Sequence, residues 1–421
     1  MLNVLKSVPN WYALPFFLLV FLLPVLAVTV DSGATSIFWL LAIPSIILCW
    51  RPKIQLHNLE KKLLYGTALF TLIMGLSLIN AEDFSESLGS YERYIRFLLF
   101  VPIYIFVRKY RYYLAPITAW GLIIGCLAMG LVAIYQFYIL DIPQPMGARQ
   151  INRFGFTAVT IFFLLVVHIL FYWRNKWVLL LACIASLIII YGIALNNTRG
   201  AMLSVFPFII LLAFAYKDAF TRKKVFLFLL ATAVLIAAFI HPSSPVGQYF
   251  HAGFDELSLF IQDPLNNYQG NWGIRPLLMY HGLLIYLESP ILGTGLGDYD
   301  NDLLVLMESG KLVVNDPAVL MGAHNIYIHI LAETGTIGFL AFMAFVFFMP
   351  TYIYTKYFLK YRDNPAIFVC ALSGLTLMIC HFIFGMSNTW LTNNSISIFL
   401  ILNLVYLTSI FTLADKEKGQ N

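Results

Sequence analysis

The chain has 421 residues, of which 60% are hydrophobic and only 11% are charged. Soluble domains carry about 25% charged residues, so this composition excludes a protein that is wetted on all sides. The formal net charge of +5 comes from basic residues dispersed along the chain, which is not typical of a nucleic-acid-binding surface.

Long apolar stretches recur along the chain, and a transmembrane helix needs about 20 such residues. The pattern predicts an all-α integral membrane protein with about twelve transmembrane helices. The first stretch follows Lys6, but no small-residue cleavage site closes it, so we expect a helix and not a signal peptide. The expected helices lie near residues 12–30, 35–50, 62–80, 95–108, 112–138, 155–173, 177–194, 200–216, 224–240, 325–349, 365–386 and 395–413.

The basic residues predict how these helices are oriented. With the N-terminus in the cytoplasm, the inner connections hold 19 of the 26 Lys and Arg residues, as the positive-inside rule requires, and both termini are then cytoplasmic. Arg93 and Arg96, in YERYIRF, are expected to snorkel to the membrane interface. The seven outer basic residues are Arg93, Arg96, Arg149, Arg153, Arg199, Arg275 and Lys311.

One connection is much longer than the others and divides the chain into three parts. We expect helices 1–9 in residues 1–240, a large outer loop in residues 241–323, and helices 10–12 with a short cytoplasmic tail in residues 324–421. Loops of this length tend to be functional or disordered. The run PLLMYHGLLIYL in the loop argues against disorder and predicts a short helix on or dipping into the membrane interface.

Arginine side chains on the outer face are candidate phosphate ligands, because the planar guanidinium binds phosphate in a bidentate way. Arg199 opens the eighth span in the stretch LNNTRGAM, and Arg275 lies in the long loop. Arg149 and Arg153 flank QIN just before the sixth span. The alternative interpretation is that these side chains only anchor the helices at the interface.

The stretch MGAHNIYIHILAETG, residues 321–335, opens the tenth span. If the helix begins at about Asn325, His324 lies at its N-terminus, where the helix dipole disfavours imidazolium and favours an anion. A neutral imidazole accepts a proton near neutral pH, so His324 is a candidate general base. The alternative is a histidine whose polar atoms are simply satisfied at the interface.

Three further features receive structural interpretations. His329 is expected to pair with Glu333 four residues later, and Gly335 and Gly338 to allow close helix contact. The acidic stretch DYDND, residues 298–302, lacks the glycine and the final glutamate of an EF-hand loop, so we expect a solvated loop.

Taken together, these stretches resemble the O-antigen ligase and polymerase superfamily of bacterial envelope proteins. The resemblance covers residues 190–345 and rests on NNTRGAML, GIRPLLMYHGLLIYLESPILGTGLGDYD and AHNIYIHILAETGTIGFL, in that order. The N-terminal half matches only in its topology. The resemblance implies a glycosyltransferase fold of the GT-C type in the bacterial inner membrane, with the active site facing the periplasm.

The resemblance also implies the reaction. The ligase moves a polysaccharide from undecaprenyl diphosphate to a sugar hydroxyl of lipid A–core, surrounded by membrane lipids, with inversion and without a cofactor, a metal or a nucleic acid. By motif, His324 is the general base. The residues assigned to the diphosphate are Arg199, Arg275, Arg153 and Arg149, and Asn325 and Tyr280 are assigned a supporting role.

Three alternatives stay open at this point. An O-antigen polymerase uses the same donor but extends another lipid-linked chain, and a protein O-oligosaccharyltransferase often carries an extra C-terminal domain. Here the chain ends at ADKEKGQN, soon after the twelfth span, which favours a ligase. A transporter or flippase would show repeat symmetry and broken helices at the membrane midplane, and the sequence contains no repeat.

Overall fold

The structure is a computed structural model, and it describes residues 14–49, 56, 58–148, 150–172, 175–216, 241, 245–263, 267–268, 273–312 and 322–411. All regular secondary structure in these ranges is helical. The expected ninth span, residues 224–240, and the candidate ligand Arg149 lie outside the described residues.

The helices follow one another along the chain with short connections. They are α2 (Leu14–Thr29), α3 (Gly33–Cys49), α4 (Asn58–Gly75), η2 (Leu76–Asn80), α5 (Phe84–Ile95), α6 (Phe100–Arg108), α7 (Arg111–Tyr138), α8 (Ile151–Tyr172), α9 (Lys176–Asn196), α10 (Arg199–Met202), α11 (Val205–Ala215), α13 (Pro245–Gln262), α14 (Ile274–Glu288), α15 (Tyr299–Glu308), α16 (Ile326–Phe342), η4 (Met343–Phe348), α17 (Met349–Lys360), α18 (Pro365–Gly385), η5 (Trp390–Thr392) and α19 (Asn394–Ser409).

The described helices confirm the class of protein that the composition predicts. Six of those in the described ranges are long and apolar enough to cross a membrane, and four shorter ones are apolar. The chain is therefore built as a helical membrane protein. The six are Asn58–Asn80, Pro116–Tyr138, Ile151–Ile169, Lys176–Asn196, Ile326–Lys360 and Pro365–Gly385.

One expected span has a different form. Near residues 95–108 the structure has the end of α5, a tight turn and then α6, which is only 9 residues long. At 1.5 Å per residue α6 extends over about 14 Å, less than half of the membrane core. The turn arises because backbone N–H groups from Phe97 to Phe100 bond the carbonyls three residues earlier.

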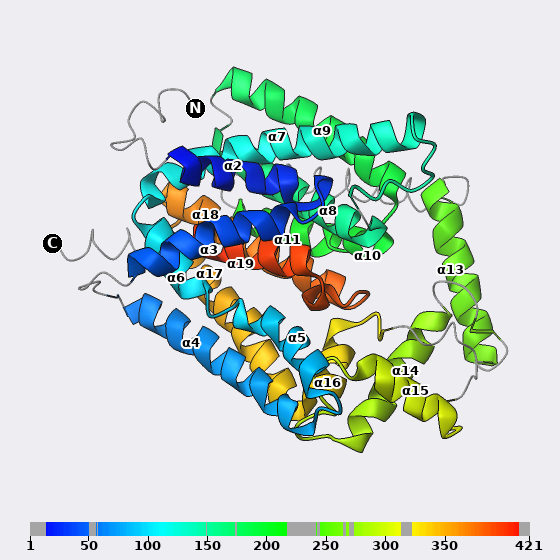
Figure 1. The fold of residues 1–421 in the computed structure, drawn as a ribbon. Coiled ribbons are helices and arrows are strands. Elements are labelled where there is room, and N and C mark those ends of the chain that lie inside the picture. Colours follow the sequence, from blue (N-terminus) through cyan, green and yellow to red (C-terminus); the bar gives the residue numbers. More distant parts are fainter. Residues whose placement is uncertain are drawn as a thin grey trace.

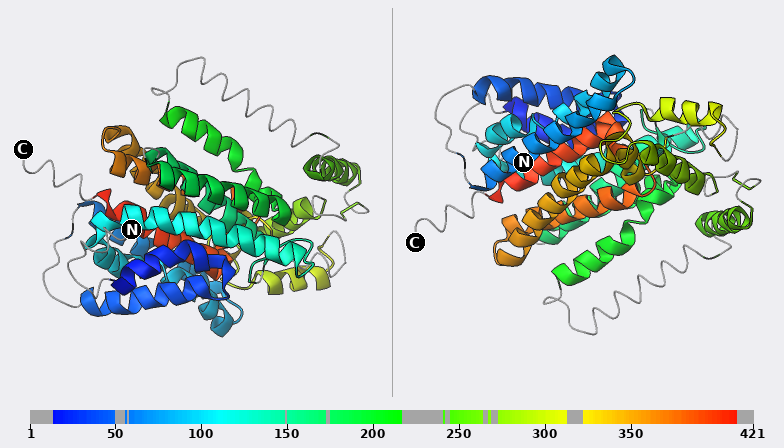
Figure 2. Two further views of the ribbon diagram at one scale, coloured as in Figure 1. Left: turned by 90° about the horizontal axis from the view of Figure 1, so that it is seen from above. Right: turned by 90° about the horizontal axis from the view of Figure 1, so that it is seen from below.

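The helices form a bundle in which α2, α7, α8 and α9 pack side by side, and α16, α17, α18 and α19 complete the other side (Figures 1 and 2). One large apolar core runs through this bundle. The long loop contributes a second, smaller core, made by Leu278 and Ile285 of α14 with Leu303 of α15. Because α14 packs against α16, the loop is anchored to the bundle.

Segments predicted to lie on the same side of the membrane lie together in the structure. At one end Arg108 forms an ion pair with Glu60, and Arg362 donates a hydrogen bond to the Ala215 carbonyl. At the other end, the amide of Asn80 at the end of η2 donates a hydrogen bond of 2.8 Å to the Gly293 carbonyl in the long loop. The polar groups that concern function are at this second end.

The tenth span departs from the expected regular helix at Gly335. Its backbone is not helical there (φ 61°, ψ −169°), and a β-carbon would overlap the carbonyl group of Ile291. Residues 290–295 supply partners for the backbone at this break: Thr336 N donates to the Pro290 carbonyl at 2.9 Å, and Gly295 N donates to the Glu333 carbonyl at 3.2 Å. Gly335 thus serves contact with a loop and not with another helix. A broken helix is tolerated at membrane depth when other protein groups satisfy its backbone in this way.

Candidate active site

Asn325 is the junction at which the candidate segments meet. Its side-chain oxygen caps α16 by accepting hydrogen bonds from Tyr327 N (2.9 Å) and Ile328 N (3.2 Å). Its amide nitrogen donates to the Met386 carbonyl at 3.3 Å and lies 3.8 Å from Met279 Sδ. Asn325 therefore connects the start of α16 with α14 and with the turn after α18.

Arg275 lies on the face of α14 that approaches this junction, because it precedes Met279 by four residues and i, i+4 side chains share a helix face. Close approach of α14 to α16 depends on Gly282, where a β-carbon would contact Ile328 Cγ2 at 2.6 Å. The guanidinium of Arg275 is partly buried. The long loop thus brings one of the predicted arginines to the N-terminus of α16.

The T-R-G segment reaches the same turn from another direction. A β-carbon at Gly200 would overlap the hydroxyl of Ser387, which follows Met386 directly. Two preceding residues fix the segment in place: Asn196 is buried and donates to the Pro145 carbonyl at 2.6 Å, and Asn197 adopts the left-handed conformation that ends α9 (φ 54°). Arg199 is consequently held at the start of α10, beside the turn that contacts Asn325.

His324 immediately precedes the cap, as the sequence predicts. Its backbone is left-handed (φ 47°), a conformation that costs a non-glycine residue about 1–2 kcal/mol and that occurs often at functional sites. Burial, and secondarily the positive charge of Arg275, lower the pKa of His324 below its ordinary value of about 6.5. The imidazole is therefore neutral at neutral pH.

The two arginines repel each other. Burial, followed by the charge of Arg199, lowers the pKa of Arg275, although a guanidinium remains protonated at any physiological pH. In the part of the chain that the structure describes, Arg275 forms no hydrogen bond and no ion pair, so no carboxylate of these ranges offsets this repulsion. An anion bound between the two guanidinium groups would offset it, and two phosphoryl groups fit that requirement.

The remaining candidates lie elsewhere. Arg153 lines a small pocket with Asp31 and Ser395, between the α2–α3 turn and the start of α19. Tyr280 is 46% exposed, on the opposite side of α14 from the buried His281. The structure therefore joins His324, Asn325, Arg275 and Arg199, while Arg153 and Tyr280 belong to other surroundings.

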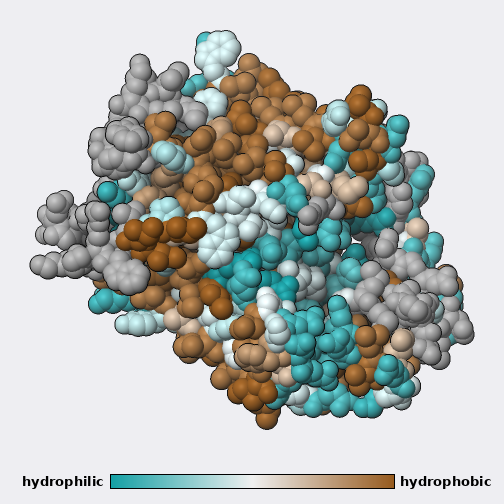
Figure 3. All heavy atoms as spheres, in the orientation of Figure 1, coloured by the Kyte–Doolittle hydropathy of each residue, from teal (hydrophilic) through white to brown (hydrophobic). Residues whose placement is uncertain are grey.

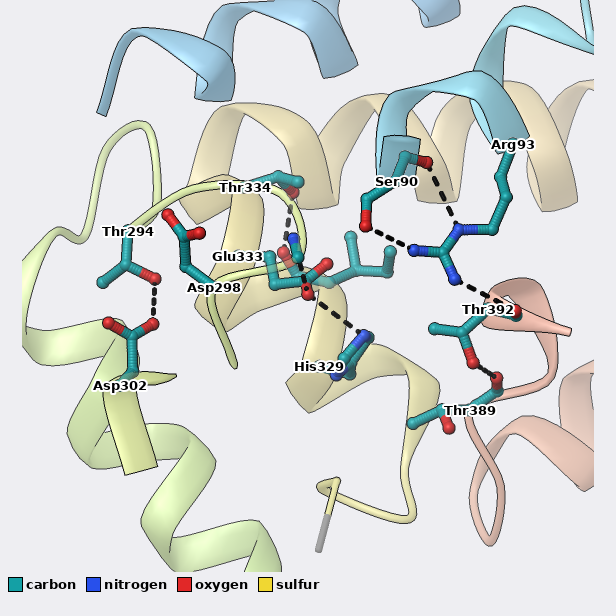
Figure 4. A network of polar contacts seen from close by, with 12 residues as sticks. Ser90, Arg93, Thr294, Asp298, Asp302, His329, Glu333, Thr334, Thr389 and Thr392 are labelled. Carbon is teal, nitrogen blue, oxygen red and sulfur yellow. Dashed lines mark hydrogen bonds and ion pairs between the residues drawn. The ribbon is translucent and has the colours of Figure 1, made fainter. Parts of the chain in front are cut away.

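A second polar cluster lies at the far end of α14 and includes most of the acidic stretch (Figure 4). Glu333 Oε1 lies 3.4 Å from His329 Nε2, as the i, i+4 spacing predicts, and accepts a hydrogen bond from Gly297 N at 3.0 Å. Asp298 is fully buried and accepts a hydrogen bond of 2.9 Å from Glu82 N. The expectation of a solvated loop is wrong for Asp298, because its carboxylate satisfies backbone N–H groups inside the fold.

The same cluster corrects the expectation for two outer arginines. Arg93 donates to the Thr392 carbonyl at 3.1 Å and to Ser90 Oγ at 2.6 Å, so it joins α5 to η5 (Figure 4). Arg96 is only 5% exposed and pairs with Glu92 at 2.8 Å. Both side chains are used in packing and do not snorkel.

The molecular surface agrees with this division. Polar residues gather in the middle and lower right of the view in Figure 3, over the region of α5, α14, α15 and α16, whereas apolar residues cover the upper part of the bundle. Sequence reasoning missed the turn at Met386 and Ser387. A signal was present: the polar run SNT, residues 387–389, interrupts two apolar spans on the predicted outer face.

Comparison with known proteins adds two findings. Residues 184–343 match the family model described as O-antigen ligase. This range contains Arg199, Arg275 and His324, and Arg153 precedes it. An uncharacterized protein of Haemophilus influenzae is 23% identical over 357 residues, which cover 83% of this chain and 86% of the relative.

Proposed function

This chain belongs to the O-antigen ligase/polymerase superfamily, whose members act on lipid-linked sugars, and from that premise we propose that it is an O-antigen ligase. It transfers a polysaccharide from undecaprenyl diphosphate to a sugar hydroxyl of lipid A–core. In this proposal the protein has a GT-C-type fold and lies in the bacterial inner membrane. The long loop covers an active site that faces the periplasm, and both termini are cytoplasmic.

The observation that carries the proposal is the meeting of one neutral imidazole with two mutually repelling guanidinium groups at the N-terminus of α16. Arg199 lowers the pKa of Arg275, and Arg275 lowers that of His324, so the three groups act on one another. Such a cluster favours a dianionic ligand at the arginines and a proton acceptor beside it. A diphosphate leaving group next to an attacking hydroxyl has this charge pattern.

In the proposed mechanism Arg199 and Arg275 bind the diphosphate and stabilise the negative charge that grows on it as the glycosidic bond breaks. The acceptor hydroxyl oxygen attacks the anomeric carbon from the opposite face, while the electron pair of the broken C–O bond leaves with undecaprenyl diphosphate. His324 takes the hydroxyl proton. One displacement at this carbon inverts its configuration.

Asn325 acts as a positioning residue in this mechanism. Its cap fixes the first turn of α16, and its amide holds the Met386 carbonyl, next to the turn that packs on Gly200. His324, Arg275 and Arg199 come from segments far apart in sequence, and Asn325 keeps their backbones in one place. Preorganised charges of this kind stabilise a transition state without rearrangement.

Purified protein offered polymer-charged undecaprenyl diphosphate, with lipid A–core as the only acceptor, tests the ligase proposal. We expect polymer-bearing lipid A–core and released undecaprenyl diphosphate. No product with that acceptor, but longer chains when lipid-linked repeat units are supplied, would identify an O-antigen polymerase. Transfer to a serine or threonine of a peptide acceptor would identify a protein O-oligosaccharyltransferase.

A transporter is the alternative from another class, in which the arginines would line a path for lipid phosphate. The same protein reconstituted in sealed vesicles distinguishes it. Movement of the lipid-linked donor across the bilayer without any acceptor, and without new glycosidic bonds, would replace the enzyme proposal.

A further inference from the structure

A cleft of about 500 Å³ lies outside the His324 cluster, between the end of η2, the last turn of α14 and α15. Its volume is within the range of small-ligand sites, about 300–1,000 Å³. We propose that this cleft binds uncharged sugar residues of the polysaccharide or oligosaccharide substrate, away from the bond that reacts. This inference rests on the proposed function, because it assigns part of a carbohydrate substrate to a second place on the same face.

The lining of the cleft suits a sugar. Asn80, Thr294 and Ser309 offer hydroxyl or amide groups, and Asp302 and Glu82 offer carboxylate acceptors. Sugar hydroxyls both donate and accept hydrogen bonds, so they satisfy this mixture. Apolar surface for the C–H faces of sugar rings comes from Ile285 and Leu306, which also line the cleft.

Charge excludes a phosphate from the same place. Glu288 and Lys311 line the cleft and neutralise each other in an ion pair of 2.6 Å, which leaves the carboxylates of Glu82 and Asp302. A phosphate would be repelled by them. The cleft and the arginine cluster therefore select different parts of one substrate: neutral sugars at one site and the diphosphate at the other.

Several polar groups in the cleft are held in fixed positions. The amide of Asn80 donates to Gly293 O at 2.8 Å and to Ser289 Oγ at 3.1 Å, and Thr294 Oγ1 donates to Asp302 at 2.5 Å. A site with fixed polar groups loses little entropy when a ligand binds. The rigidity comes from the same loop that pairs with the break in α16 at Gly335.

The helix α14 sets the separation between the two sites. Arg275 is in its first turn, and Ile285 and Glu288 are 10 and 13 residues later, so the sites lie about 15–20 Å apart along the helix. That distance requires an oligosaccharide and not a single sugar. The ligand is therefore either the chain carried by the donor or the core oligosaccharide of the acceptor, and both have the same chemistry.

Two variants of α15 test the cleft. Val305 lines it and is 53% exposed, so Val305→Trp fills the cleft without disturbing the core. Leu304 is 41% exposed on the same helix and is not among the lining residues, so Leu304→Trp is the matched control. Both proteins are assayed for transfer with donors carrying one repeat unit or a polymer, and with full or truncated lipid A–core.

We expect Val305→Trp to lower kcat/KM by about tenfold or more for the longer substrate, relative to the shorter one, and Leu304→Trp to leave that ratio unchanged. A loss confined to polymer-charged donors places the donor chain in the cleft, and a loss confined to full lipid A–core places the acceptor there. Unchanged ratios in both comparisons, with transfer intact, would overturn the cleft proposal and leave the proposed function standing.

Direct binding separates the two proposals in the opposite case. Lipid-free, phosphate-free oligosaccharide from the same cell's lipopolysaccharide is added to the full-length protein, and saturation-transfer NMR measures contact. Binding that Val305→Trp weakens and Leu304→Trp preserves supports the cleft even if the wild-type protein transfers nothing. No transfer together with no binding would refute both proposals.

Discussion

Arg275 lies in the first turn of α14, and the cleft that contains Asp302 lies at its last turn; the two ends of this helix have polar surroundings of opposite kinds. At the first end, cations repel each other, and within the described ranges Arg275 has no carboxylate partner. At the second end, hydroxyl and backbone N–H groups hold the carboxylates: Thr294 donates to Asp302, and Glu82 N donates to Asp298. The comparison shows how a fold separates a site prepared for an external anion from a site whose charges it satisfies itself.

Burial affects titration differently at the two ends. It lowers the pKa of His324, whose neutral form is favoured, and it raises the pKa of Asp302 to about 6, with the neighbouring carboxylates of Asp298 and Glu82 adding to the rise. The imidazole is therefore ready to accept a proton at neutral pH, whereas Asp302 is largely ionised there and bound to a hydroxyl. Four predictions follow from this contrast, in order of decreasing effect.

Removing the imidazole breaks the first end. His324→Ala should lower the transfer rate by about 10²–10⁴-fold, the usual contribution of a general base. His324→Gly should be equally inactive but more stable than His324→Ala by about 1 kcal/mol, because glycine adopts φ 47° without strain. Transfer assays and melting temperatures in detergent measure both effects.

The control for this pair is His251→Ala, which removes an exposed histidine from α13. It should keep wild-type transfer. Wild-type-like transfer by His324→Ala would remove the base assignment.

Changing Arg199 tests whether the first end needs a guanidinium or only a charge. Arg199→Ala should cost about 10²–10³-fold in kcat, as loss of a donor to developing charge does elsewhere. Arg199→Lys should be nearly as damaging if both nitrogens bind the diphosphate, because lysine cannot bind in a bidentate way. Kinetics with the polymer-charged donor measure the difference, and full activity of the lysine variant would indicate a simple charge effect.

Adding one carbon at the break in α16 should loosen the second end. Gly335→Ala places a side chain in a backbone conformation open only to glycine and against the Ile291 carbonyl, which should cost about 3 kcal/mol of stability. Gly89→Ala, in α5 with open space around it, should instead stabilise by about 0.5–1 kcal/mol. Thermal unfolding of both variants measures this contrast, and equal melting temperatures would show that the loop does not depend on the break.

The smallest expected effect is a change in pH dependence. His324 must be neutral to act as the base, so its lowered pKa should extend activity below pH 6.5, and the acid limb of kcat/KM should report this pKa. Arg275→Gln removes the second cause of the lowering and should move the limb to higher pH by a fraction of a unit. Arg275→Lys keeps the charge and should leave the limb in place; a limb that is identical in all three proteins would separate Arg275 from His324.

Much of this architecture could be predicted from local sequence. Apolar length predicts most of the helices, and the i, i+4 spacing of His329 and Glu333 predicts their contact, because helix geometry alone fixes both. The N-terminus of α16 beside His324 also follows from Asn325, a residue type that caps helices with its own side chain. The motif order predicts the family range.

The rest depends on contacts between residues far apart in sequence. Nothing local indicates that Asp298 would be buried against Glu82 N, that Arg93 would bond η5, or that Gly335 would meet the loop at Ile291, since each partner lies tens to hundreds of positions away. Arg153 illustrates the converse: its position before a span resembles that of Arg199, yet it lines a different pocket.

The sequence by itself determined that this is a helical membrane protein with one long loop, and which side chains carry charge near its outer boundary. Only the tertiary structure decided which of those charges act on one another, because burial and distance set the strength of an electrostatic interaction and neither is written in local order. The packing of α14 on α16 through Gly282 brings Arg275 to His324, and the same helix separates the cationic end from the carboxylate-lined cleft.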